Sequence, residues 1–258
     1  MSSVWWVNTF VGQEAGGNPT CVILDDFDEV TRSRASVARA LRAPDTAFVK
    51  RAFAGLTIKF FSPLEGEMSF CGQGFIAADA VLRQTTKVAG PFEFLTTDGN
   101  VRTYAEPGDD ALSWFEILKS QIRIDSGPRH LGHIVDSGRR RAFRQLDSAE
   151  LENLNLDSSE VIRTCTEYNI KGLCFYAYER RDVLRLRVFT VSLGGREDIS
   201  TGGAVAGLTP LIPSGKWLVQ QGSGHFLNRG ELRLNNNIET DRISVGGRVE
   251  FVAQGNLL

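Results

Sequence analysis

The sequence lacks the features that would place it at a membrane or on nucleic acid. No uninterrupted run of about 18 apolar residues is present, so we expect no membrane-spanning helix. The opening residues MSSVWWVNTF do not have the charged and apolar regions of a signal peptide. Neither sign of charge is in excess, since 29 Lys and Arg stand against 31 Asp and Glu. This balance argues against nucleic acid or an anionic membrane as a partner.

Local charge and metal ligands are also scarce. One short basic cluster, formed by Arg139, Arg140, Arg141 and Arg144, is interpreted as a solvated loop. No two of the four cysteines have C-x-x-C spacing, and the three histidines are distant from them in sequence. A metal site is therefore not expected. We expect reduced thiols and a cytoplasmic protein.

What remains is an ordinary globular composition, with 42% hydrophobic and 23% charged residues over 258 positions. That length suits one large domain or two smaller ones. Most segments between the Gly and Pro turns are short and rich in β-branched or aromatic residues, which predicts strands. One apolar helix is predicted in each half of the chain. The predicted fold class is therefore α+β.

The two halves repeat one order of predicted elements. TAFVKRAFAGLTIKFFSP (46–63) aligns with CFYAYERRDVLRLRVFTV (174–191), and CGQGFIAADAVL (71–82) aligns with TGGAVAGLTPLI (201–212). Each set predicts a β-hairpin, then a glycine-rich turn, then an apolar helix. An internal duplication explains this order, although two unrelated hairpin–helix units would also look alike.

The glycine-rich turns are candidate anion sites. Gly72 and Gly74 in one half, and Gly202 and Gly203 in the other, leave main-chain N–H groups uncovered at a helix N-terminus. Such groups favour a carboxylate without any basic side chain. Two turns that face one another would hold a small carboxylate between the halves. The same glycines could instead serve only close packing of helix on strand.

Four side chains near these turns are candidates for proton transfer. Cys71 is expected to have a lowered pKa at a helix N-terminus and to serve as a thiolate base, with Thr201 facing it. Asp45 directly precedes a predicted strand, and Asp198 precedes the second turn. Their alternative roles are to cap a turn or a helix. If both carboxyls point into one cleft, burial and mutual repulsion would raise their pKa values and suit acid–base chemistry.

Several segments together resemble a known family. Similarity to the phenazine-biosynthesis isomerase (PhzF-like) family, which shares the diaminopimelate epimerase fold, is carried by VNTFVGQEAGGNPTCVIL, PDTAFV, CGQG, EDISTGG, QQGSGHFLNRGEL and ISVGGRVEFV. The resemblance implies two pseudo-symmetric halves, each a β-barrel wrapped around a central α-helix. The halves would be residues 1–110, joined by the C-terminal strand, and residues 111–258. It also implies a cofactor-free site between the halves, proton transfer on a small carboxylate, and a homodimer.

The family's functional residues are retained in part. Its general-base glutamate falls on Asp45, a carboxylate one methylene shorter, and its aspartate falls on Asp198. Its histidine falls on Gln73, which cannot exchange protons, and a serine falls on Gly203. The CGQG turn is closer to the cysteine turn of the diaminopimelate epimerases and amino-acid racemases on this fold. Those enzymes use two cysteines, whereas the facing residue here is Thr201.

Three functions stay open on this sequence. The first is a cofactor-independent isomerase that moves a proton, and with it a double bond, on a small amino-acid-like or unsaturated carboxylate in secondary-metabolite biosynthesis. The second is an amino-acid epimerase or racemase that uses Cys71, and a cysteine–threonine pair would also suit a dehydration. The third is a non-catalytic protein that binds a small carboxylate. The catalytic candidates are Asp45, Cys71, Asp198 and Thr201, and the substrate-binding candidates are Asn18, Gly72, Gln73, Gly74, Gly202 and Gly203.

Overall fold

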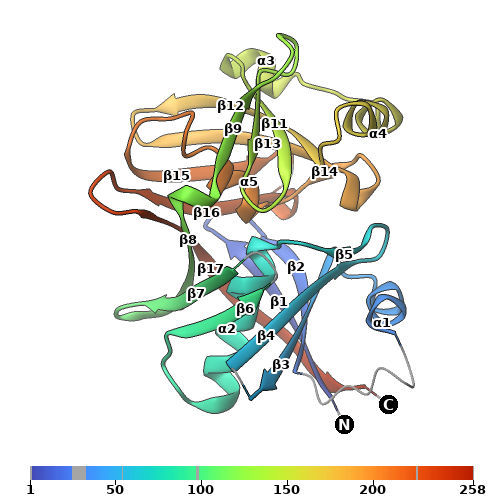
Figure 1. Cartoon of the computed structure of the whole chain (residues 1–258), viewed down its shortest axis with the longest axis vertical. Helices are drawn as coiled ribbons and strands as arrows, with labels where there is room; N and C mark the ends of the chain where they lie inside the picture. Colours follow the sequence, from blue (N-terminus) through green and yellow to red (C-terminus); the bar gives the residue numbers. More distant parts are fainter. Residues whose placement is uncertain (1, 25–32, 54, 97–98, 225, 258) are drawn as a thin grey trace.

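The computed structural model describes residues 2–24, 33–53, 55–96, 99–224 and 226–257. Figure 1 shows two groups of strands, one above the other along the long axis, with the N-terminal part of the chain in the lower group. Both chain ends lie at the bottom, where β1 (Ser3–Val11) pairs antiparallel with β17 (Arg242–Asn256). The last strand of the chain therefore belongs to the lower group.

The strands of the lower group close into a barrel. Around the barrel they are β1, β2 (Asn18–Leu24), β3 (Asp45–Ala52), β4 (Gly55–Ser62), β6 (Phe92–Thr96), β7 (Gly99–Glu106), β8 (Asp109–Leu118) and β17, which pairs again with β1. The β2–β3 and β4–β6 pairs are parallel, and the others are antiparallel. The short β5 (Gly66–Met68) pairs antiparallel with the end of β4, and α1 (Arg34–Leu41) packs outside on β3 and β4. The predicted boundary between residues 110 and 111 falls inside β8 and stays a prediction.

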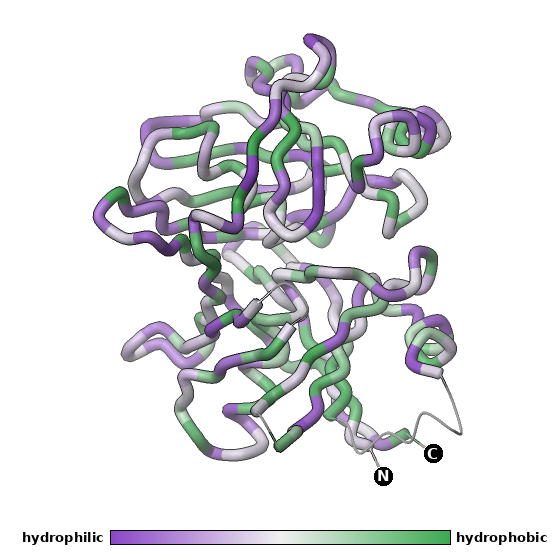
Figure 2. Tube along the Cα trace, in the orientation of Figure 1, coloured by the Kyte–Doolittle hydropathy of each residue, from purple (hydrophilic) through white to green (hydrophobic). Residues whose placement is uncertain are grey.

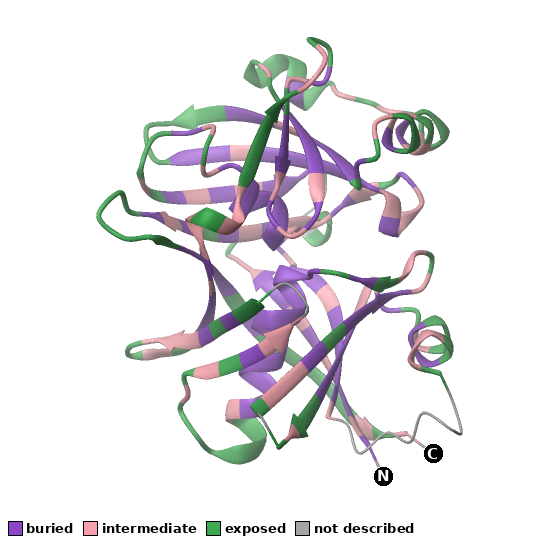
Figure 3. Ribbon diagram, viewed as in Figure 1, coloured by how far each residue is buried: buried purple, intermediate pink, exposed green. Residues whose placement is uncertain are grey.

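Helix α2 (Gly72–Thr86) occupies the interior of this barrel. Its residues 72–82 are all buried, as their nearly uniform apolar composition predicts (Figure 3). The exceptions in composition are Gln73, which lies at the start of the helix, and Asp79, whose carboxylate accepts hydrogen bonds from Arg83 Nε at 3.0 Å and from Thr103 Oγ1 at 2.9 Å. These partners offset the cost of burying a charge.

The upper group repeats the order of elements in the lower one. The elements β12 (Gly172–Arg180), β13 (Val183–Thr190), β14 (Glu197–Asp198), α5 (Gly202–Gly207), β15 (Gly215–Gly222) and β16 (Arg229–Asn236) follow the order of β3, β4, β5, α2, β6 and β7. The pairing repeats as well, since β12–β13 is antiparallel like β3–β4, and β13–β15 is parallel like β4–β6. The predicted α+β fold with two pseudo-symmetric halves is confirmed.

The remaining elements lie between the two repeats or in short turns. They are β9 (Arg123–Ser126), β10 (His133–Asp136), β11 (Arg140–Gln145), α3 (Ser148–Glu152), α4 (Ser158–Glu167) and the 3-10 turns η1 (Lys119–Gln121), η2 (Val191–Leu193) and η3 (Phe226–Asn228). Strand β11 lies parallel to β12, as β2 lies parallel to β3. The start of β11 therefore occupies the same place in its half as the start of β2.

One hydrophobic core passes through both halves. Hydrophobic residues concentrate along the strands and the central helices, while the outer turns are hydrophilic (Figure 2). A single buried cluster contains Phe75 of α2, Val205 of α5 and Phe115 of β8. The interface between the halves is thus packed like the interior of each. None of the helices in the described ranges is long and apolar enough to cross a membrane.

Candidate active site

The N-termini of α2 and α5 meet where the two halves join. Cys71 is the N-cap residue of α2 and Thr201 is the N-cap residue of α5, as the alignment of the two glycine-rich turns predicts. A Cβ atom on Gly72 would come within 2.9 Å of Gly202 Cα and within 2.8 Å of Phe115 Cε1. These two glycines therefore allow a backbone contact that no other residue type would permit.

A small cavity opens between the two turns. Its volume is about 30 Å³. Of the predicted site residues, the cavity wall contains Asp45, Cys71, Gly72, Gln73, Asp198, Thr201, Gly202 and Gly203. The other two lie directly behind the wall, since Asn18 bonds to Gln73 and Asp198, and Gly74 N–H donates to Cys71. The fold thus brings all ten predicted residues to one place.

Asp45 begins β3 and has one close hydrogen-bond donor. Its Oδ2 accepts from Cys71 Sγ–H at 3.3 Å, and no other described residue donates to this carboxyl. Burial raises the pKa of Asp45 to about 7, and the negative charge of Asp198 adds to that rise. The thiol and the charge of Arg139 lower this pKa, but by less. A carboxyl with a pKa near neutrality is suited to both taking and returning a proton.

Asp198, by contrast, is held as a hydrogen-bond acceptor. Its Oδ1 accepts from Asn18 Nδ2 at 2.8 Å, and its Oδ2 accepts from Thr201 Oγ1 at 2.6 Å. Gln221 Nε2 donates to Thr201 Oγ1 at 2.9 Å, so the hydroxyl hydrogen is directed at Asp198. Burial raises the pKa of Asp198, while the bonds from Thr201 and Asn18 lower it. A change of protonation would therefore disturb fewer hydrogen bonds at Asp45 than at Asp198.

Asn18 links the first half to Asp198. Its side chain is 1% exposed, and Nδ2 lies 2.9 Å from Gln73 Oε1 and 3.0 Å from the Ser200 carbonyl, besides its bond to Asp198. Gln73 Nε2 in turn donates to Thr20 Oγ1 at 2.9 Å. The amide of Gln73 is thus committed to protein partners, and its contribution here is to position Asn18.

The expected lowered pKa of Cys71 is wrong. The thiol sulfur accepts from Gly74 N–H at 3.3 Å, which is the stabilisation that a helix N-terminus offers. Burial and the neighbouring charge of Asp45 nevertheless raise the pKa of this thiol well above its ordinary value. In the free protein Cys71 is a neutral thiol that caps α2 and donates to Asp45.

The interpretation of the arginine cluster as a solvated loop is also wrong. Arg139 and Arg141 are only 6% and 4% exposed, and both line the cavity. Arg140 between them is only partly buried and pairs with Asp125 at 3.6 Å, because successive side chains along an extended chain point to opposite faces. The internal repeat could have indicated that arginines of this cluster are buried near the site. The start of β11 corresponds to the start of β2, where Asn18 lies at the site.

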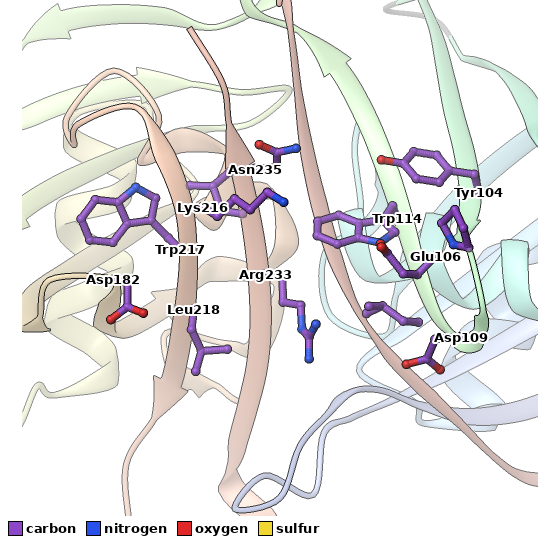
Figure 4. A pocket seen from close by; sticks show the side chains of 13 residues that line it. Tyr104, Glu106, Asp109, Trp114, Asp182, Lys216, Trp217, Leu218, Arg233 and Asn235 are labelled. Carbon is purple, nitrogen blue, oxygen red and sulfur yellow. The ribbon is translucent and has the colours of Figure 1, made fainter.

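A wider groove lies outside this site, between the β7–β8 hairpin and β15 and β16 (Figure 4). Its volume is about 570 Å³. Its wall contains stacked rings of Tyr104 and Trp114, 6.4 Å apart, and Trp114 Nε1 donates to Glu106 Oε2 at 2.7 Å. No thiol and no facing pair of buried carboxyls lines this groove, so the smaller cavity is the candidate site. Nowhere in the described ranges do three His, Cys, Asp or Glu side chains gather closely enough to hold a metal ion.

Known proteins of similar sequence and structure agree with this picture. Residues 7–117 match the model of a family described as phenazine biosynthesis-like protein. An uncharacterized isomerase of Deinococcus radiodurans is 26% identical, over 96% of this chain and 89% of that protein. The predicted resemblance to the PhzF-like family is confirmed. The relatives are named isomerases, and this protein is accordingly an enzyme of the isomerase class.

Solved structures of proteins from other organisms have the same fold. A putative phenazine biosynthesis PhzC/PhzF protein from Clostridium difficile superposes with a TM-score of 0.78 at 19% identity, and the match covers all of both chains. A hydroxyproline epimerase from Agrobacterium vitis superposes with a TM-score of 0.63 at 11% identity, over 98% of this chain and 91% of that one. The fold is therefore shared by PhzF-like proteins and by epimerases.

Proposed function

We propose that this protein moves a proton, and with it a double bond, on a small unsaturated or amino-acid-like carboxylate. Asp45 is the group that takes the proton and returns it. The observation that carries the proposal is the unequal environment of two carboxyls in one cavity. Asp45 has a single thiol donor and a pKa near 7, whereas Asp198 is held by Asn18 and Thr201. Two carboxyls in such different environments take different roles, so Asp45 exchanges the proton and Asp198 orients the substrate.

In the proposed reaction, Asp45 alone accounts for the proton that is removed and returned. Ionised Asp45 removes a proton from a carbon that is conjugated with the substrate carboxylate, and the electron pair left behind delocalises towards that carboxylate. Gly74 N–H in the first turn of α2 already donates to Cys71, but the N–H groups of Gly72 and Gln73 have no acceptor within the helix and stabilise the developing charge. Protonated Asp45 then returns its proton to another carbon of the conjugated system. The substrate is isomerised, and Asp45 is ionised again.

The neighbouring side chains position the reacting groups in this scheme. Cys71 S–H holds the Asp45 carboxyl by a hydrogen bond, and Asp198 with Thr201 orients an amine or hydroxyl of the substrate. The cavity of about 30 Å³ is too small for such a substrate. The two turns must therefore separate for binding, and their closure would exclude water from the reacting carbon.

The test is uptake of solvent hydrogen. The protein is incubated in heavy water with a panel of amino acids and unsaturated amino-acid-like carboxylates, and each compound is analysed by mass spectrometry and NMR. We expect one deuterium in one compound, at a carbon beyond the α-carbon, with a shifted double bond. Asp45→Asn should lower the rate by about 100- to 10,000-fold. Asp125→Asn, which changes an exposed aspartate, should leave the rate unchanged. Full activity of the Asp45 variant would rule out the assigned role.

A second candidate function is epimerisation at the α-carbon with Cys71 as a base. The observation that favours it is the contact of the Cys71 thiol with Asp45, which offers a route for removal of the thiol proton. Deuterium at the α-carbon with loss of configuration, abolished in Cys71→Ser, would select this candidate. Tight binding of a carboxylate without any deuterium uptake would select a non-catalytic binding protein.

Further parts of the proposal do not rest on the site. A role in secondary-metabolite biosynthesis and a homodimer rest on the family resemblance, and a cytoplasmic location rests on the sequence features described above. Mass photometry of the purified chain tests the homodimer, for which a mass of twice 28.4 kDa is expected.

A further inference from the structure

The guanidinium of Arg141 has an unused hydrogen-bonding edge. The residue is 4% exposed, and its Nη1 donates to the main-chain carbonyl of Arg139 at 3.2 Å. Its Nε is buried without any hydrogen-bond partner. No described residue forms a hydrogen bond or ion pair with its Nη2. The Nε–H and Nη2–H groups point in the same direction, so the edge they form has no hydrogen-bond acceptor among the described residues.

Arg187, in the same half, has an acceptor on the corresponding Nε–Nη2 edge of its guanidinium. Its Nε and Nη2 donate to the two carboxylate oxygens of Glu197 at 2.8 and 2.7 Å, while its Nη1 donates to the main-chain carbonyl of Leu151 at 3.0 Å. Arg141 reproduces the carbonyl contact of Nη1 but has no carboxylate on its other edge. The missing partner has the geometry of one carboxylate.

Among the described residues, none pairs with the charge of Arg141 through an ion pair. Arg139 beside it forms an ion pair with Glu65, whose carboxylate also contacts Lys171 Nζ at 3.1 Å. Asp198 is near enough to attract Arg141, but it is not within ion-pair distance. A buried guanidinium without a paired anion is costly, so proteins rarely keep one without a use.

Arg141 lies beside the second glycine turn, in the wall of the cavity that contains Asp45. A Cβ atom on Gly203 would come within 3.3 Å of Arg141 Nη1 and 3.6 Å of Nη2. Glycine at this position therefore leaves the guanidinium uncrowded. An anion on the empty edge would share the cavity with the proton-exchanging carboxyl.

We propose that Arg141 determines substrate specificity by binding one carboxylate of the substrate through its Nε–Nη2 edge. This inference rests on the proposed function, because it assigns the side chain that recognises the carboxylate of the proposed substrate. The planar fork of the guanidinium matches the two oxygens of a carboxylate. An amide or ester of the same acid would leave the buried charge unpaired, so the site should reject it strongly.

Binding can be observed at Arg141 itself without knowledge of the substrate. The probes are formate and acetate, with formamide and acetamide as neutral controls, titrated into the nitrogen-15-labelled protein. We expect the Nε–H signal of Arg141, assigned by its loss in Arg141→Lys, to shift saturably with the carboxylates only. The signal of Arg187, whose edge is already occupied, should not move. An Arg141 signal that stays still at saturating formate would overturn the proposal, and a stronger response to inorganic phosphate would replace carboxylate with phosphate as the ligand class.

A matched pair of variants tests specificity in the reaction. Arg141→Gln should raise the KM of the compound that takes up deuterium by at least about 100-fold, with kcat changed by less than about tenfold. Arg140→Gln, which alters the neighbouring partly exposed arginine, should leave both constants unchanged. Arg141→Lys keeps the charge but loses the fork, and it should raise KM by at least about tenfold if the glutamine variant does not fold.

The two proposals fail in different ways. Deuterium uptake with an unchanged KM in Arg141→Gln would overturn the role of Arg141 and leave the isomerase proposal intact. A shift of the Arg141 signal with formate, without deuterium uptake in any compound, would support carboxylate recognition and count against the isomerase. The inference is therefore tested separately from the chemistry on which it builds.

Discussion

Single residues in the cavity differ in what their neighbours allow them to do. Asp45 and Asp198 have the same side chain, but Asp198 accepts two strong hydrogen bonds and Asp45 accepts one weak bond from a thiol. Cys71 sits at a helix N-terminus, which lowers the pKa of a thiol, yet burial and the adjacent carboxyl of Asp45 together raise the pKa of this thiol. The role of each group follows from its contacts and not from its residue type alone.

Asp45→Asn should change how stability depends on pH. The pKa of this carboxyl rises from 3.8 to about 7, so the folded state binds its proton more tightly than the unfolded state does. The group therefore stabilises the fold fully below about pH 4, and that contribution is lost as the pH rises through 7. The loss amounts to at most about 4 kcal/mol.

Urea unfolding at pH 4, 6 and 8 measures this effect. The variant and the unchanged protein should have similar stability at pH 4, and the variant should be the more stable at pH 8. Parallel stability curves for the two proteins over this range would contradict a raised pKa at Asp45.

Cys71 variants separate the capping role of the thiol from a role as base. Cys71→Ser keeps an acceptor for Gly74 N–H and a donor for Asp45, so stability and activity should change little. Cys71→Ala removes both contacts and should cost about 1 kcal/mol relative to the serine variant. Thermal unfolding and deuterium uptake are the two measurements. Complete loss of activity in the serine variant would make the thiol the base.

Local sequence predicts some residues of the site better than others. Asp45 and Asp198 could be proposed because carboxyls beside glycine-rich turns have an obvious chemical use. Arg141 could not, because a run of arginines is ordinarily solvated and the sequence does not show which of them lack an acidic partner. The pKa of Cys71 could not be predicted from local sequence either, since it depends on burial of the thiol and on the charge of Asp45, 26 residues away in the chain.

At the scale of elements, the site is made by two helix N-termini that touch through glycine. Helix α2 was predictable because its apolar residues continue around the whole helix, which only a buried position explains. Helix α5 was predicted to run through residue 212 but ends at Gly207. Pro210 cannot donate an N–H to a continuing helix, and tertiary packing rather than apolar pattern sets the end.

Gly72→Ala should separate the two helix ends. The added Cβ would meet Phe115 Cε1 at 2.8 Å and Gly202 Cα at 2.9 Å, and a backbone atom cannot move aside as a flexible side chain can. We expect a loss of about 1–3 kcal/mol in unfolding free energy. Gly255→Ala is the control, because its Cβ would meet only Val4 Cγ1 at 3.7 Å. Equal stability of the two variants would show that the turns are not in close contact.

At the scale of the whole molecule, β17 joins the two halves. It pairs with β1 and β8 in the lower group and with β16 in the upper group. The repeat order was predictable from the sequence because hairpin, turn and helix recur at a nearly constant offset. The closure of the lower barrel by the last strand of the chain was inferred only from the family resemblance, because pairing between distant segments leaves no local pattern.

A chain that ends at residue 241 should therefore fail to fold. Removal of β17 would leave β1 and β8 as unpaired edges and would expose the core at the junction. A chain that ends at residue 256 keeps every residue of β17 and is the control. Circular dichroism and size-exclusion chromatography should show an aggregated or unfolded product only for the shorter chain. A cooperative folded monomer without β17 would contradict the closed arrangement.

The most direct test of the central claim is a carbon-13 NMR titration of the aspartate side-chain carboxyls. The claim is that Asp45 holds the exchangeable proton of the cavity, so one resonance should titrate near pH 7 and disappear in Asp45→Asn. A resonance near pH 7 that persists in Asp45→Asn, or the absence of any carboxyl that titrates near neutrality, would contradict the account.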